Sequence, residues 1–294
     1  MSSRPFRLAW VGLGAFGLPI ALNFVRQGWL VTHVEVQGRG RSGAAALLEA
    51  GGHAAVTVPG DADALVLCLP RDNDIDGVLA VIGEAAPGLI VDLSTCAPSQ
   101  SAARQARLAR CGRTYVDAPV SGSRQQAEAG ELLVFCGRGD LQPRGLREIL
   151  HTVGREVVLL GRPGAGAEVK LMNQMMHLAI MAVIGDVFGA MLRAGLAPDV
   201  ALAAVAKGSG GSRMLDRFGE LIVARSHPPQ FSLTNAFKDV ELASEFLAER
   251  GYRSALWRDV ADAYQATMTR RGGGENFSVV CEHFAEGGAA AVAG

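Results

Sequence analysis

Residues 7–17, with the sequence Arg7-Leu8-Ala9-Trp10-Val11-Gly12-Leu13-Gly14-Ala15-Phe16-Gly17, decide the fold. An apolar run typical of a buried strand leads into glycines spaced G-x-G-x-x-G, and an apolar-periodic stretch at 18–27 follows. Such glycines permit a tight turn, a close backbone approach to a pyrophosphate, and tight packing of helix on strand. The motif predicts a dinucleotide site, with a purely structural turn as the alternative. The loop residues expected to bind the cofactor are Gly12, Leu13, Gly14, Ala15, Phe16 and Gly17.

Apolar runs and amphipathic stretches alternate through the first half of the chain. The expected strands are 7–11, 31–36, 64–69, 89–93, 114–117, 132–136 and 157–160, and the expected helices are 18–27, 42–50, 76–85 and 99–110. This alternation predicts βαβ units and a mainly parallel sheet covered by helices on both faces.

The pattern changes at the breaker cluster 162–166. Residues 167–193 are helical throughout, which corresponds to ~40 Å at 1.5 Å per residue. Beyond Gly195 we expect only helices, at 198–206, 213–224, 233–249 and 255–269. The predicted fold class is α/β: an N-terminal Rossmann-type doubly wound sheet domain (1–162), then a helical substrate and oligomerisation domain (163–294) that begins with a long connecting helix.

Composition excludes several classes of protein. There are 28 Lys and Arg against 29 Asp and Glu, a net charge of −1, which argues against binding to duplex nucleic acid or to an anionic membrane surface. The cysteines number five, an odd count, and no two have C-x-x-C spacing. We therefore expect a cytoplasmic protein without disulfides or a metal site. The stretch 171–185 is too short and too polar to span a bilayer.

The cofactor preference depends on the end of the second expected strand. Glu35 follows Gly17 at the distance where a carboxylate accepts hydrogen bonds from the adenosine ribose and repels a 2′-phosphate. This favours NAD. Arg39 and Arg41, just downstream, leave NADP possible if one of them binds the phosphate instead.

A second group of candidates follows the strand at 114–117. The chain breaks there into Ser121-Gly122-Ser123, which offers hydroxyl and backbone N–H donors suited to a small carboxylate. The alternative for this segment is an ordinary turn.

A third group lies on the long helix. At 100° per residue, Lys170, Asn173, Gln174 and His177 share one face. Lys170 is the only lysine before residue 207, and its apolar neighbours could lower its pKa enough for general acid–base catalysis. The alternatives are a lysine that extends to solvent and a histidine that is simply packed.

These features together resemble the β-hydroxyacid dehydrogenase family, which includes 3-hydroxyisobutyrate dehydrogenase, tartronate semialdehyde reductase and the glyoxylate/succinic semialdehyde reductases. Beyond the glycine loop, the matching stretches are Asp92-Leu93-Ser94-Thr95, Asp117-Ala118-Pro119-Val120-Ser121-Gly122, Gly164 to Asn173, and Phe237-Lys238-Asp239. The resemblance covers nearly the whole chain, from Leu8 to about Ser278.

The resemblance implies roles for individual residues. Thr95 would contact the nicotinamide side of the cofactor, Ser121 and Gly122 would hold the substrate carboxylate, and Lys170 would be the catalytic acid/base. Lys238 would reach the cofactor from the helical domain. Leu69 and Pro70 complete the predicted cofactor-binding set, and Ser123, Asn173, Gln174 and His177 complete the substrate-binding set.

Two positions depart from the family pattern. The family usually has Asn where this chain has Gln174, and an apolar residue where it has His177. Glu35-Val36, in contrast, resembles the acid–hydrophobe pair of NAD-preferring members.

The expected function is NAD(P)-dependent interconversion of a small hydroxy acid and its semialdehyde or keto acid, by a homodimer or homotetramer. One alternative is an imine reductase, a branch that commonly replaces the family lysine. The other is a non-catalytic module for cofactor binding or oligomerisation.

Overall fold

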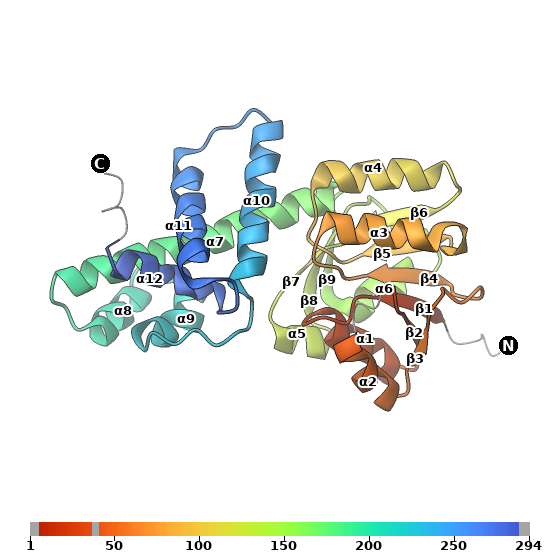
Figure 1. The fold of residues 1–294 in the computed structure, drawn as a ribbon, viewed down its shortest axis with the longest axis horizontal. Coiled ribbons are helices and arrows are strands. Elements are labelled where there is room, and N and C mark those ends of the chain that lie inside the picture. Colours follow the sequence, from red (N-terminus) through yellow and green to blue (C-terminus); the bar gives the residue numbers. More distant parts are fainter. Residues whose placement is uncertain (1–5, 37–40, 288–294) are drawn as a thin grey trace. The chain divides into compact units, whose positions relative to one another are not determined.

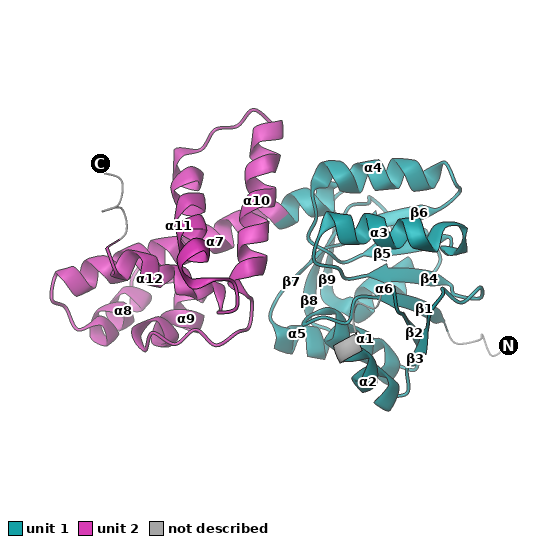
Figure 2. Ribbon diagram, in the orientation of Figure 1, with its two compact units in different colours: residues 1–170 teal, residues 171–294 magenta. Residues whose placement is uncertain are grey.

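The computed structural model describes residues 6–36 and 41–287, without the side chains of Arg41 and Ser42. It divides the chain into two compact units, residues 1–170 and 171–294 (Figure 2). The first unit contains the strands and the second consists of helices, so the predicted α/β fold with an all-helical C-terminal part is confirmed.

The main sheet of the first unit has the order β3-β2-β1-β4-β5-β6, and every neighbouring pair is parallel. Its strands are β1 (Arg7–Val11), β2 (Leu30–Val34), β3 (His53–Ala55), β4 (Ala64–Leu67), β5 (Leu89–Asp92) and β6 (Thr114–Asp117). This is the strand order of a doubly wound dinucleotide-binding sheet. The sequence did not predict β3, because three residues, two of them exposed, carry almost no pattern.

Helices cover the two faces of this sheet: α1 (Gly17–Arg26) and α2 (Arg41–Glu49) lie on one side, and α3 (Asp72–Ile82) and α4 (Pro98–Ala109) on the other (Figure 1). Alternate residues of β1 point to opposite faces. Leu8 belongs to the core that contains Phe24 of α1, and Ala9 to the core that contains Ile75 of α3. Strands β1, β4 and β5 consist largely of apolar residues because both of their faces are buried.

A smaller sheet follows, formed by β7 (Val120–Ser121), β8 (Leu132–Cys136) and β9 (Gly154–Leu159). The pair β7–β8 is antiparallel and the pair β8–β9 is parallel. The sequence predicted strands at 132–136 and 157–160 but not that they form a sheet of their own. The sequence analysis missed the intervening α5 (Arg124–Ala129) and α6 (Leu146–Val153). Helix α5 has only 6 residues, whereas α6 does carry a helical pattern, with Leu146, Ile149, Leu150 and Val153 buried on one face.

The helices that follow are α7 (Ala165–Arg193), α8 (Pro198–Lys207), α9 (Arg213–Val223), α10 (Leu233–Glu249), α11 (Ala255–Arg271) and α12 (Val280–Ala285). Three of these helices are N-capped by serine. The hydroxyls of Ser212, Ser232 and Ser254 accept hydrogen bonds from backbone N–H groups in the first turns of α9, α10 and α11. Short 3₁₀ turns lie at Gly83–Ala85 and Phe277–Val279. The sequence missed the short helix α12.

Helix α7 is the long helix that the sequence predicted at 167–193, and it begins two residues earlier. Its full 29 residues have the length and composition of a membrane-crossing helix, although the stretch 171–185 alone is too short for one. However, Leu178, Met181 and Phe188 belong to the core of the second unit, together with Phe218 and Tyr264. This burial is typical of the core helix of a globular unit.

Candidate cofactor and catalytic site

The glycine loop has the geometry that its spacing predicted. Gly12 has φ +101°, and a Cβ there would lie 2.2 Å from the Cys68 carbonyl oxygen. A Cβ on Gly17 would lie 2.0 Å from the Gly12 carbonyl oxygen. The protein's own backbone therefore requires glycine at both positions.

Gly14 differs from these two glycines. It is exposed, and a Cβ placed on it would meet no described atom within 4 Å. A glycine is useful at such a place if a ligand approaches the backbone. The loop leads into the N-terminus of α1, where the N-cap is Phe16 and the first turn contains no acidic residue. The positive end of the helix dipole is thus open to an anion, and these residues fit a dinucleotide pyrophosphate.

The other predicted cofactor residues lie along the same edge of the sheet. Glu35 directly follows β2, Leu69 and Pro70 follow β4, and Thr95 follows β5. Carboxyl ends of neighbouring parallel strands share one edge, and dinucleotides bind outside that edge. The structure therefore brings these residues together with the glycine loop. Of the competing arginines, Arg39 lies outside the described residues, and the side chain of Arg41 is not described.

A buried network supports this edge, and the sequence analysis gave it no role. Asp92, 1% exposed, accepts hydrogen bonds from the Tyr115 hydroxyl and from the Ser94 N–H. The Ser94 hydroxyl accepts one from the Leu69 N–H at 2.9 Å and thereby ties the loop after β4 to the loop after β5. Burial raises the pKa of Asp92 above its ordinary value, and these hydrogen bonds oppose the rise.

A second buried acid, Asp117, holds the beginning of α7. It ends β6, and its two carboxylate oxygens accept hydrogen bonds from the N–H groups of Gly164 (3.0 Å) and Ala167 (3.1 Å). A Cβ on Gly137 or Gly166 would lie within 2.8 Å of this carboxylate, so both glycines make room for it. Burial raises the pKa of Asp117 to about 6. This contact joins the edge of the sheet to the helix that carries Lys170.

The Ser121-Gly122-Ser123 segment is more ordered than a simple turn. Ser121 ends β7, and Gly122 has φ +154° with its Cβ position 2.6 Å from the Leu132 side chain. Ser123 caps α5: its hydroxyl accepts from the Gln126 N–H, and its own N–H donates to Gln126 Oε1 at 2.8 Å. The capping box fixes the direction of the chain just after Ser121 and Gly122.

Lys170, Asn173, Gln174 and His177 all lie on α7, as predicted. Lys170 is 8% exposed and Gln174 is 4% exposed. The His177 ring packs edge-on against Phe277 at 4.7 Å between centroids and stacks on Phe231 at 6.1 Å. The structure thus shows the packed histidine that the sequence left as an alternative, one turn after Asn173 and Gln174 on α7.

Lys238 lies on α10 in the second unit. Its Nζ is 3.0 Å from Oδ1 of the neighbouring Asp239, which is 2% exposed. The other oxygen of Asp239 accepts a hydrogen bond from Gln174 Nε2 at 2.5 Å. The sequence analysis quoted Asp239 as part of a motif but assigned it no function.

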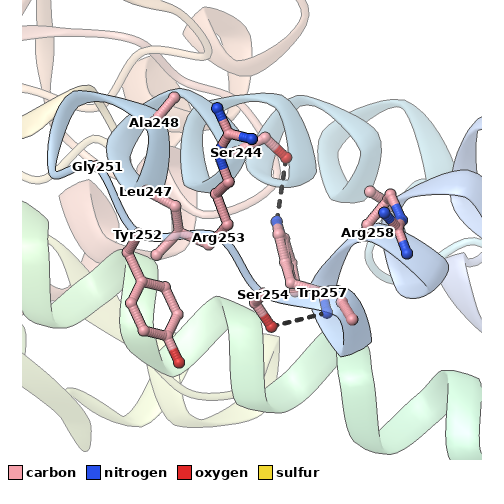
Figure 3. Close-up of a pocket in the computed structure, with 11 residues that line it drawn as sticks. Ser244, Leu247, Ala248, Gly251, Tyr252, Arg253, Ser254, Trp257 and Arg258 are labelled. Carbon is pink, nitrogen blue, oxygen red and sulfur yellow. Dashed lines mark hydrogen bonds between the residues drawn. The ribbon is translucent and has the colours of Figure 1, made fainter.

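A hollow of about 650 Å³ lies between the ends of α10 and α11 (Figure 3). Trp257 and Tyr252 line it, and the Trp257 indole N–H donates to the Ser244 hydroxyl at 3.0 Å. None of the predicted site residues lines this hollow, so it is not the candidate site. Within residues 6–36 and 41–287, no group of three His, Cys, Asp or Glu side chains is arranged to hold a metal ion.

Comparison with protein families agrees with this geometry. Residues 7–161 match the family described as the NAD binding domain of 6-phosphogluconate dehydrogenase. Residues 164–284 match the NAD-binding region of NADP-dependent 3-hydroxyisobutyrate dehydrogenase. The fold and site therefore define an NAD(P)-dependent oxidoreductase. More particularly, the chain belongs to the β-hydroxyacid dehydrogenase family, whose members act on CH–OH groups.

Individual relatives are distant but cover most of the chain. The 2-(hydroxymethyl)glutarate dehydrogenase of Eubacterium barkeri is 27% identical over 251 residues, 82% of each protein. A 3-hydroxyisobutyrate dehydrogenase structure from Salmonella typhimurium superposes with a TM-score of 0.84 at 24% identity, over 95% of this chain and 100% of that one. A Streptomyces aurantiacus imine reductase has the same fold, with a TM-score of 0.61 at 24% identity, over 94% of this chain and 98% of that one.

Proposed function

We propose that the chain interconverts a short hydroxy acid and its semialdehyde or keto acid, with Lys170 as general acid/base. The observation that carries this proposal is the Asp117 contact. It fixes the first turn of the Lys170 helix to the sheet edge on which the proposed cofactor residues lie.

A bound nicotinamide would supply or accept the hydride at its C4 atom. The chain's own residues would transfer the proton and bind the substrate. In the reducing direction, the carbonyl carbon gains the hydride, and Lys170 Nζ donates a proton to the carbonyl oxygen, so that a hydroxyl forms. In the oxidising direction, neutral Lys170 accepts the hydroxyl proton. Proton transfer of this kind contributes roughly 10²–10⁴-fold to the rate.

The substrate-binding residues of this proposal are those that the family resemblance implies. We propose that the Ser121 hydroxyl and the Gly122 N–H hold the substrate carboxylate. Ser123, Asn173, Gln174 and His177 are the further candidate substrate residues, and Thr95 and Lys238 would contact the cofactor.

The proposal that the substrate carries a carboxylate can be tested directly. Hydrogen bonds to a charged group contribute about 1.5–3 kcal/mol each, so removal of the charge should lower kcat/KM roughly 10- to 100-fold. The measurement compares a hydroxy acid with its methyl ester and its amide at matched chain length. Equal kcat/KM values for acid and ester would contradict the carboxylate site.

We expect NAD to be preferred over NADP, because the Glu35 carboxylate would occupy the place that a 2′-phosphate needs. Glu35→Ser should narrow or reverse the preference, measured as the ratio of kcat/KM for the two cofactors. Glu49→Ser, an exposed change on α2, is the matched control and should leave the ratio unchanged. A wild type that prefers NADP would show that our assignment of Glu35 is wrong.

One experiment tests the whole proposal: a panel of short hydroxy acids and semialdehydes with both cofactors, followed by the absorbance of the reduced nicotinamide ring. Turnover of a hydroxy acid supports the proposal. A cyclic imine belongs in the same panel, since turnover of the imine alone would favour the imine reductase activity of a fold relative.

Three further properties belong to the proposal. We take the functional boundary to fall at residues 162/163, so that the helical domain carries the long helix. We expect this domain to form a homodimer or homotetramer, and we expect the protein to work in the cytoplasm. Size-exclusion chromatography with light scattering measures the oligomeric state.

A further inference from the structure

The side chain of Gln174 is engaged at both ends of its amide. Its Nε2 donates to Asp239 Oδ2 at 2.5 Å, and its Oε1 accepts from Asn173 Nδ2 at 3.1 Å. The side chain is 4% exposed. Residue 174 thus links α7 to α10 within the second unit, between positions 65 residues apart in the chain.

Asp239 needs such a partner. A buried carboxylate is costly unless other groups compensate its charge. Gln174 contacts one oxygen, and Lys238 Nζ lies 3.0 Å from the other. Neighbouring residues on a helix do not face each other, so Lys238 must bend its side chain toward Asp239. A carboxylate held by Gln174 gives this ammonium group a fixed place.

The length of the Gln174 side chain makes the contact possible. Asparagine, the usual residue of the family here, is shorter by one C–C bond, about 1.5 Å. From the same position on α7, its amide would fall short of Asp239, because the present distance would lengthen beyond a hydrogen bond.

We propose that Gln174 is a positioning residue that acts through Asp239 to hold Lys238, rather than a ligand of the substrate carboxylate. The inference rests on the proposed function only in taking Lys238 to be a cofactor contact. This role would account for glutamine at a position where the family usually has asparagine. The extra methylene lets the amide reach Asp239, and through it Lys238, in place of a contact with the substrate.

The test is a double-mutant cycle that combines Gln174→Asn and Asp239→Asn. Its first readout is the Kd of NAD and of NADH for each variant, measured by titration without substrate. Each single variant should weaken cofactor binding by about 10-fold. The double variant should bind the cofactor no more weakly than the single variant with the higher Kd, because both changes break the same link. Gln265→Asn, an exposed glutamine on α11, is the control and should not change Kd.

Kinetics separate this role from direct substrate binding. In Gln174→Asn the KM of the cofactor should rise, and the acid-to-ester ratio of kcat/KM should stay as in the wild type. Multiplicative effects on Kd in the double variant, or a fall in the acid-to-ester ratio, would overturn the inference. Failure of the hydroxy acid panel would contradict the proposed function alone, since the Kd cycle needs no substrate.

Discussion

Replacement of Lys170 by alanine is expected to lower kcat by at least about 100-fold and to leave the Kd of the cofactor unchanged. Lys170 is the candidate proton donor of the reaction, and its helix is fixed to the sheet through Asp117. Alanine keeps the helix but removes the amine, so the loss should fall on the chemical step. The measurement is kcat from steady-state kinetics, with Kd from a cofactor titration.

Two variants make the result specific. Lys170→Arg keeps a positive charge but cannot release its proton near neutral pH, and it should be as inactive as the alanine variant. Lys207→Ala, an exposed lysine at the end of α8, is the matched control and should retain full activity. If Lys170→Ala kept more than about a tenth of the wild-type kcat, Lys170 would not be the general acid/base.

Much of the fold could be predicted because its information is local and repeated. The central strands β1, β4 and β5 are buried and largely apolar on both faces, and Gly12 and Gly17 are required because a Cβ at either position would clash with nearby backbone. The separate sheet β7-β8-β9 could not be predicted, since strand partnership depends on contacts distant in sequence. Helices α5 and α12, with 6 residues each, give too few turns for a pattern, whereas the buried positions of α6 are spaced i, i+3, i+4, i+7 and could have been recognised.

For the candidate site, the sequence indicated where some of the residues lie in the fold. Periodicity put Lys170 and Gln174 on one helix, and the end of the second expected strand gave Glu35, whereas Thr95 came only from the family resemblance. Which polar groups bind each other depends on tertiary contacts, so the roles of Asp92, Asp117 and Asp239 were missed. A signal was present for two of them: Asp92 and Asp117 each end an apolar strand, where a charged residue needs a partner.

Asp117→Ala is expected to have the second large effect, on both stability and activity. It would leave the N–H groups of Gly164 and Ala167 buried without their acceptor. Each lost acceptor costs about 1–3 kcal/mol, so the loss of both should lower the free energy of unfolding by about 2–6 kcal/mol. With the first turn of α7 released, kcat should also fall, since a displacement of ~1 Å at a catalytic group can cost ~10²-fold. Urea denaturation and steady-state kinetics measure the two effects.

The pH dependence of stability distinguishes a buried, titrating Asp117 from a passive one. Burial raises its pKa from 3.8 to about 6 in the folded protein, so between these values the folded state binds a proton that the unfolded state has lost. The stabilisation from Asp117 is therefore full below about pH 4 and decreases, by at most about 3 kcal/mol, as the pH rises through 6. Asp117→Asn does not titrate. The measurement is the free energy of unfolding of the wild type and of Asp117→Asn from pH 4 to 7.5. The difference, wild type minus variant, should fall with rising pH and level off above about pH 6. A difference that stays flat or grows with pH would mean that the hydrogen bonds from Gly164 and Ala167, which lower the pKa of this carboxyl group, offset or outweigh the effect of its burial, and the raised pKa of Asp117 would have to be abandoned.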